Sequence, residues 1–246
     1  MKKNIWALLP FLLLLSGCYF YFEGISGSGR LITSTYYISG FSAVEADDSS
    51  MVNITYGNYY SVSVICDDNL LPYIDIYSDG YTLHAGLIGG YSYLNNTYTV
   101  NITMPVLRSV KADNASDVQV SGFTLTTRLD LILTGASRMN VYLTDADVLS
   151  LMTDGYSKAE IHSVYPLSRV YLNCSEASSV DLRDMLCAYG EIDIRDSSSV
   201  KINMIDPVYE SFGLIGQVCR ASVLYYRGPQ GPGPILFTEG SSLVYY

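Results

Sequence analysis

The chain has 246 residues, of which 49% are hydrophobic, and 14 basic residues against 24 acidic ones give a formal net charge of −10. This apolar content is enough for a sizeable core, and no internal apolar run is long enough to span a bilayer. The acidic balance argues against nucleic acid as a partner, because binding phosphate requires a basic surface.

The first residues form a targeting segment. Lys2 and Lys3 precede an apolar core that ends in Leu15-Ser-Gly-Cys18. This tetrapeptide resembles the bacterial lipobox, which implies that residues 1–17 are a lipoprotein signal peptide and that Cys18 carries a diacylglycerol and an acyl chain such as palmitate. Several acyl chains give a durable membrane anchor, since each buried CH₂ contributes about 0.8 kcal/mol. Tyr19, which follows the Cys in place of Asp, favours sorting to the outer membrane. The alternative to the lipobox interpretation is an ordinary secretory signal with a chance Cys.

Residues 18–30, aromatic and then rich in Gly and Ser, are predicted to form a lipidated tether. Residues 31–106 are predicted to form a less regular N-terminal β region, because short runs of alternating apolar and polar residues are typical of strands. Asp67–Ile74 predicts a short helical turn, and Ser78-Asp-Gly predicts a hairpin. The predicted strands cover residues 32–38, 41–46, 51–56, 60–65, 75–77, 81–87 and 97–104.

From Leu107 a short phrase recurs at a nearly fixed period. Each copy is a corner of small residues followed by alternating apolar and polar residues, and the copies share one serine position, with steps of 21, 20, 21 and 20 residues. The shared serines are Ser116, Ser137, Ser157, Ser178 and Ser198. A repeat of this length is too small to bury its own apolar face, so neighbouring copies must stack.

The repeat therefore predicts an all-β fold, a parallel β-helix or β-solenoid with coils of about 20 residues over residues 107–246. The serines are predicted to be structural, and small corner residues allow close approach and, for Gly, positive φ. Alternate strand residues are expected to fill the interior. The expected interior residues are Val118, Val120, Leu131, Leu133, Met139, Val141, Leu149, Leu151, Leu172, Val180, Leu182, Ile192, Ile194, Val200 and Ile202.

The order of motifs over residues 36–204 resembles the auto-transporter adhesin, head GIN domain family. The resemblance is carried by Gly40-Phe41, Tyr60-Ser-Val-Ser-Val, Asp79-Gly80 and Val100-Asn-Ile-Thr-Met-Pro before the Ser repeats. It implies a right-handed, helix-like β domain exposed in the cell envelope of bacteria such as Bacteroidetes, and it brings no catalytic residues. The chain departs from the family pattern in having Asn, Glu or Asp where Gly is preferred before the corner.

The C-terminal part predicts two further coils at Arg220-Ala-Ser-Val-Leu-Tyr and Gly240-Ser-Ser-Leu-Val-Tyr. Between them, Arg227-Gly-Pro-Gln-Gly-Pro-Gly-Pro cannot be a central strand, because Pro lacks the ladder donor. We expect this segment to be a loop.

No enzyme motif is present, and His84 and His162, the two histidines, are far apart without a nucleophile motif beside them. We predict no enzymatic activity, no catalytic residue, no cofactor and no metal, although Asp47-Asp48 and Asp67-Asp68-Asn69 leave calcium binding as an alternative. Outward charges are expected to pair across neighbouring strands. These are Arg128, Asp130, Arg138, Lys158, Glu160, Asp181, Arg183, Asp193, Arg195 and Lys201.

Four cysteines remain besides Cys18, and their even number leaves two disulfides or buried free thiols open. They are Cys66, Cys174, Cys187 and Cys219. The chain also has 23 tyrosines, many in adjacent pairs such as Tyr36-Tyr37, which alternation would divide between the inside and the outside. Exposed tyrosines suit glycan or protein recognition.

The leading hypothesis is a non-enzymatic, lipid-anchored protein of the bacterial envelope that presents a β-solenoid surface for adhesion to a glycan or an envelope protein. A polysaccharide-processing β-helix enzyme is the first alternative. An envelope accessory protein that binds a signalling partner is the second.

Overall fold

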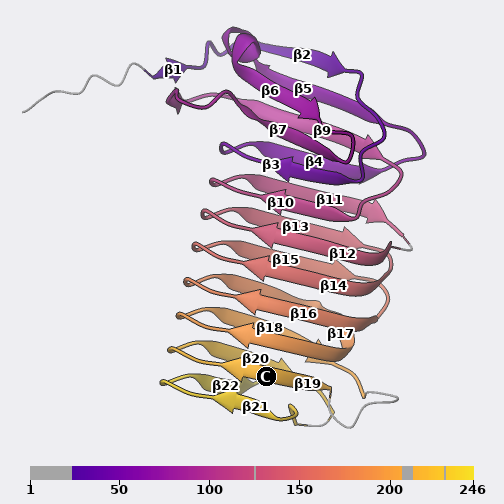
Figure 1. Cartoon of the computed structure of the whole chain (residues 1–246), viewed down its shortest axis with the longest axis vertical. Coiled ribbons are helices and arrows are strands. Elements are labelled where there is room, and N and C mark those ends of the chain that lie inside the picture. The colour runs from indigo at the N-terminus through magenta and orange to yellow at the C-terminus, as the bar shows by residue number, and fades with distance from the viewer. Residues whose placement is uncertain (1–23, 125, 207–212, 230) are drawn as a thin grey trace, which may run out of the picture.

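The chain folds into one elongated stack of β-strand coils (Figure 1). The structure is a computed structural model and describes residues 24–124, 126–206, 213–229 and 231–246. Each regular coil contributes one strand to each of two sheets, here called sheet 1 and sheet 2, and the core lies between them. Successive regular coils pair in parallel. The predicted all-β parallel solenoid is therefore confirmed.

Sheet 1 extends along the whole stack. In stacking order its strands are β6 (Ile74–Ser78), β7 (Thr82–Leu87), β3 (Ala43–Ala46), β10 (Ser109–Ala112), β12 (Thr126–Leu133), β14 (Ala146–Thr153), β16 (Leu167–Cys174), the C-terminal half of β17 (Ser179–Ile194), β19 (Leu214–Val218) and β21 (Ile235–Phe237).

Sheet 2 lies on the other side of the core. Its strands are β2 (Leu31–Tyr36), β5 (Ser61–Asp67), β9 (Tyr98–Met104), β4 (Met51–Tyr56), β11 (Asp117–Phe123), β13 (Arg138–Leu143), β15 (Lys158–Ser163), the N-terminal half of β17, β18 (Ser199–Met204), β20 (Val223–Arg227) and β22 (Ser242–Tyr245). A looser bend leads each coil from sheet 2 back to sheet 1.

The tight corners that lead from sheet 1 to sheet 2 share one conformation. Two consecutive residues have positive φ, and a serine follows. The pairs are Asp48-Ser49, Asn114-Ala115, Gly135-Ala136, Gly155-Tyr156, Glu176-Ala177, Asp196-Ser197, Arg220-Ala221 and Glu239-Gly240. At the second of these corners, the backbone N–H of Ser116 donates to the Asp113 carbonyl at 3.1 Å. Two left-handed residues closed by such a bond make a type I′ turn.

The corner serines stack in one column, which Ser50 and Ser222 extend beyond the five predicted positions. These seven serines are at most 1% exposed, whereas Ser241 at the eighth corner is partly exposed. The Ser50 hydroxyl donates to the Ser116 hydroxyl at 3.3 Å, and the backbone N–H of Ser198 donates to the Ser222 hydroxyl at 3.2 Å. These bonds support the predicted structural role of the serines.

The interior forms aligned columns of apolar side chains. Leu131, Leu151, Leu172 and Ile192 are partners in successive pairings, and each is at most 3% exposed. All fifteen residues expected in the interior are buried, so the predicted alternation is confirmed.

The N-terminal region adds an antiparallel layer at one end of the stack. β3 and β4 already form a coil that lies directly on β10 and β11. Above it, β9 pairs parallel with β4 and antiparallel with β5, and β2 pairs antiparallel with β5. The predicted hairpin is β6–β7, and the predicted helical turn is the 3₁₀ helix η3 (Asp68–Tyr73). This layer covers the end of the core.

Part of the segment assigned to the tether is folded. β1 (Ile25–Ser26) pairs with β8 (Tyr93–Leu94). The Asp67 carboxylate, 2% exposed, accepts hydrogen bonds from the backbone N–H groups of Gly29 at 2.6 Å and Thr97 at 2.7 Å. A buried carboxylate needs such partners, so residues 24–30 are held against the domain.

The C-terminal part contains the two further coils that the sequence predicts, with β20 on β18 and β22 on β20. Residues 228–229 and 231–234 contain no strand, as expected for the Pro/Gly segment. Among the described residues, no helix has the length and apolar character needed to cross a membrane.

Candidate binding surface

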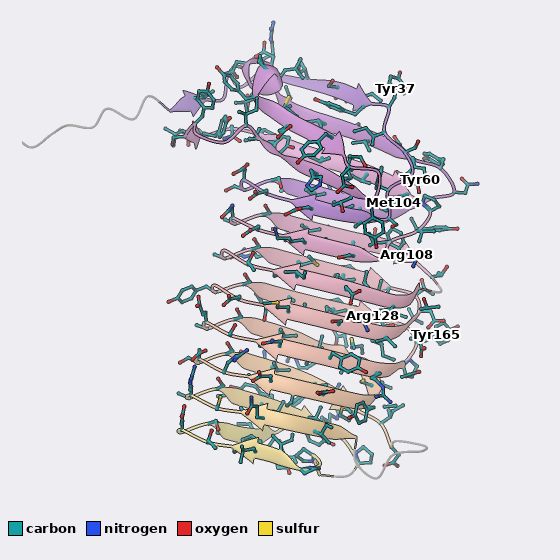
Figure 2. The ribbon with its side chains drawn as sticks, viewed as in Figure 1. Tyr37, Tyr60, Met104, Arg108, Arg128 and Tyr165 are labelled. Atoms are coloured by element: carbon teal, nitrogen blue, oxygen red, sulfur yellow. The ribbon has the colours of Figure 1, made fainter. Side chains whose placement is uncertain are left out.

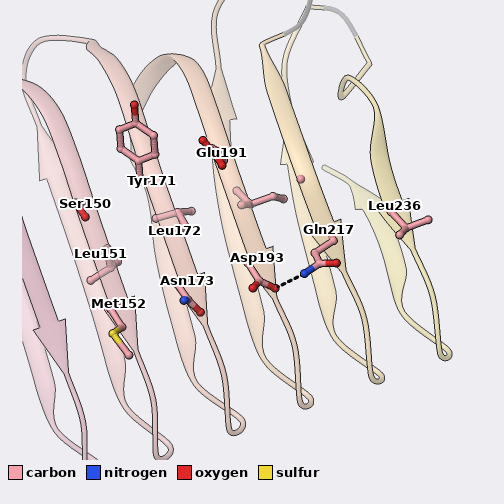
Figure 3. Close-up of a pocket in the computed structure, with 12 residues that line it drawn as sticks. Ser150, Leu151, Met152, Tyr171, Leu172, Asn173, Glu191, Asp193, Gln217 and Leu236 are labelled. Carbon is pink, nitrogen blue, oxygen red and sulfur yellow. Dashed lines mark hydrogen bonds between the residues drawn. The ribbon is translucent and has the colours of Figure 1, made fainter.

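A shallow depression of about 690 Å³ lies on the outer face of sheet 1, across β14, β16, β17, β19 and β21 (Figure 3). Its lining combines polar side chains with a few apolar and aromatic ones. Its outward-facing lining consists of Ser150, Met152, Tyr171, Asn173, Glu191, Asp193, Gln217 and Leu236. Met152 is 44% and Leu236 60% exposed, so the depression offers apolar surface beside hydrogen-bonding groups.

Gly216 in β19 shapes this depression. Its φ is +134°, and a Cβ built on it would lie 1.9 Å from the carbonyl oxygen of Ile192. Only glycine therefore fits this position. The isolated glycine in Leu214-Ile-Gly-Gln-Val218 is the sequence signal for such an irregular strand, and it was not among the predicted features.

A hydrogen-bond network orders the polar groups of the depression. The Gln217 side-chain amide donates to Asp193 at 3.1 Å (Figure 3). Arg195 lies 3.4 Å from the other oxygen of Asp193 and donates to Asn173 Oδ1 at 3.3 Å. Because Asn173, Asp193 and Gln217 lie on three neighbouring strands, β16, β17 and β19, the network links amide and carboxylate groups across three coils. Tyr171, on the same face, adds an aromatic ring.

The outward charges pair mostly within one strand rather than across strands. Arg128 with Asp130, Lys158 with Glu160, and Arg183 with Asp181 are separated by two residues and lie 2.9, 2.6 and 2.8 Å apart. Side chains at positions i and i+2 share a sheet face, which explains this preference. A cross-strand pair also exists, since Lys201 lies 3.5 Å from Asp181. Such exposed pairs contribute at most about 1 kcal/mol.

The two histidines lie in separate clusters. His84 Nδ1 is 3.2 Å from Glu45, and its ring stacks on Tyr77 with centroids 4.6 Å apart. Lys111 also bonds to Glu45, and this hydrogen bond raises the pKa of Lys111. His162, in β15, is 3.1 Å from Asp184 and stacks on Tyr142. No serine or cysteine nucleophile is paired with either histidine among the described hydrogen bonds.

The adjacent tyrosines follow strand alternation in the body of the stack. Tyr226 is 2% exposed while its neighbour Tyr225 is half-buried, and Tyr37 is 99% exposed while Tyr36 is half-buried. At the last coil both Tyr245 and Tyr246 are exposed. Tyr37 and Tyr165 project from the edge of the molecule in Figure 2.

The four described cysteines are free thiols. Burial raises the pKa of Cys174 to about 12 and that of Cys187 to about 12, and it also raises the pKa of Cys66. Raised pKa values keep these thiols protonated and unreactive at neutral pH. They behave as small core residues. Cys18, the predicted lipidation site, lies outside the described residues.

The acidic residues considered for calcium binding interact with other groups of the fold. Asp68 bonds to Ser28 and Arg30, which lower its pKa, in that order of importance. Burial and then the neighbouring Asp47 raise the pKa of Asp48. In the part of the chain that the structure describes, no group of three or more His, Cys, Asp or Glu residues could hold a metal ion.

Stacked coils with repeated type I′ corners define a parallel β-solenoid protein. Residues 40–217 match the family model described as "Putative auto-transporter adhesin, head GIN domain", and the chain belongs to this family. The resemblance found in the sequence is confirmed. The family description indicates a surface or envelope location and an adhesin-like, non-enzymatic role. No functionally curated protein matches the chain.

Solved structures share this fold. A "putative adhesin" from Bacteroides fragilis superposes with a TM-score of 0.75 at 16% identity, covering 90% of this chain and 99% of its own. A "putative adhesin" from Parabacteroides distasonis gives 0.70 at 18% identity, covering 91% and 100%. Another P. distasonis structure, described as a "putative lipid binding protein", gives 0.71 at 17% identity over the same shares. At these identities the likeness concerns the fold alone.

Proposed function

We propose that this protein is a non-enzymatic, lipid-anchored adhesin of the bacterial envelope that binds a saccharide in the depression on sheet 1. The observation that carries the proposal is the combination of Tyr171 with the fixed polar groups Asn173, Asp193 and Gln217 in one hollow. Saccharides present an apolar ring face and several hydroxyls. An aromatic ring and convergent amide and carboxylate groups complement both features.

The anchor follows from Leu15-Ser-Gly-Cys18. A lipid on Cys18 would hold the chain at the membrane, with the outer membrane favoured by Tyr19. The family's adhesin description supports a role in which the anchored solenoid meets an external partner.

Replacement of Tyr171 by Ala tests the binding site. An aromatic stacking contact contributes about 0.5–1.5 kcal/mol, so affinity for a bound saccharide is expected to fall up to about tenfold. The protein is applied to a polysaccharide and oligosaccharide array, scored for both retention and product release. Tyr156→Ala is the matched control, because Tyr156 is 75% exposed at a corner outside the depression.

Two results would contradict the proposal. Equal retention by the Tyr171→Ala and Tyr156→Ala variants would remove the depression as the binding site. Release of shortened products would favour the polysaccharide-processing enzyme instead.

A further inference from the structure

A second aromatic cluster lies on sheet 2, away from the depression. Tyr142 in β13 and His162 in β15 are direct partners in the strand pairing. Their rings are stacked with centroids 4.5 Å apart and planes 3° apart. Asp184, in the bend of β17, lies 3.1 Å from His162 Nδ1 through its Oδ2. The carboxylate therefore contacts the imidazole, and the imidazole stacks against the tyrosine ring from one side.

A hollow of about 420 Å³ adjoins this cluster. It is bounded by Tyr142, His162, Asp184 and Val164, and by Gly122 from the preceding coil. Gly122 sits where the pairing register of β11 and β13 shifts, with φ +81°, and it brings no side chain to the hollow. Tyr142 is 52% and Val164 73% exposed. An aromatic surface, backed by a fixed ring, is thus open to solvent.

The charges around the hollow are arranged so that Asp184 is the acidic group facing it. Glu160 is paired with Lys158 at 2.6 Å, and Asp181 is paired with Arg183 at 2.8 Å. A carboxylate at this position accepts hydrogen bonds from hydroxyl groups and repels acidic sugars. With Nδ1–H donating to Asp184, His162 Nε2 is left to accept a hydrogen bond from a further hydroxyl.

We infer that this hollow is a second saccharide-binding site, which holds a neutral sugar ring against Tyr142 and binds its hydroxyls through Asp184 and His162. The second site is formed by residues different from those of the sheet 1 depression, and the inference does not depend on that depression. Since the two sheets face opposite sides of the core, one molecule can bridge two glycan chains.

The test measures binding to neutral and acidic oligosaccharides by the full-length protein in detergent. Tyr142→Ala is expected to weaken retention of neutral sugars about tenfold, the loss of one aromatic stack. Tyr142→Phe should keep retention, because the ring face is preserved. Tyr37→Ala is the matched control, since Tyr37 is almost fully exposed far from the hollow. Denaturant melts show whether each variant is folded.

The two sites are separated by combining variants. In the Tyr171→Ala background, adding Tyr142→Ala should lower the remaining neutral-sugar retention about a further tenfold. The inference is overturned if Tyr142→Ala binds like Tyr37→Ala, if acidic sugars alone are retained, or if no neutral sugar is retained in the Tyr171→Ala background. A loss from Tyr142→Ala with no loss from Tyr171→Ala would sustain this site and remove the proposed one.

Discussion

At the scale of single residues, the corners depend on left-handed backbone that the sequence did not reveal. Serine spacing located the five corners from Ser116 to Ser198, but positive φ was expected only at glycines. Glu176 and Arg220 adopt it nevertheless, with φ of 52° and 55°. Backbone bonds between coils hold the conformation: Tyr156 N–H donates to the Glu176 carbonyl at 2.9 Å. The stack thus overrides the local preference of L-residues.

This strain gives a prediction at Glu176. Left-handed backbone costs an L-residue about 1–2 kcal/mol, and glycine avoids this cost. Against this gain, glycine loses about 0.5–1 kcal/mol more conformational entropy on folding. Glu176→Gly should therefore stabilise the protein by about 0.5–1 kcal/mol in urea melts. Gly155→Ala, the reverse change at the preceding corner, should destabilise it by at least as much, because its Cβ would lie 3.0 Å from Gly135 N. A loss of stability in Glu176→Gly would show that the corner is not strained.

At the scale of strands and coils, alternation predicted the strands and the interior correctly, because each strand has one buried face. The antiparallel pairings of β2, β5 and β9 were not predictable from alternation, which carries no information on partners. A signal was present only for the parallel pairing of β4 with β9: Val52-Asn-Ile-Thr55 and Val100-Asn-Ile-Thr103 are identical segments, and they are register partners. The depression was missed for a similar reason, since it brings together residues from separate coils.

The register can be tested by two substitutions in neighbouring coils. Leu151→Ala should cost about 2–5 kcal/mol, because it removes a side chain that is 2% exposed and leaves a cavity. Asp130→Ala on the outer face of the preceding coil should change stability by less than about 0.5 kcal/mol, since its partner Arg128 is half exposed. Denaturant unfolding measures both. Equal losses would mean that outward residues hold the stack together and that the register is wrong.

At the scale of the whole molecule, the antiparallel layer and the regular coils lie at opposite ends of the stack. β1, near the start of the described chain, lies beside that layer (Figure 1). A lipid on Cys18 would therefore attach at this end, with the regular coils extending away from it. Both proposed sugar sites lie on the sides of those coils. This arrangement would leave them accessible beyond the membrane surface, which suits a protein that contacts another surface.

The anchor itself predicts a change in where the whole molecule is found. Cys18→Ser removes the thiol that would receive the diacylglycerol, so the variant should leave the membrane fraction and should not incorporate labelled palmitate. Cys219→Ser is the matched control, because Cys219 is a free, partly exposed thiol in the folded part and should leave both properties unchanged. Cell fractionation and palmitate labelling measure the two outcomes. If the Cys18→Ser variant stays with the membrane and is still labelled, the lipobox interpretation is wrong, and the solenoid would need another attachment to act as an adhesin at the cell envelope.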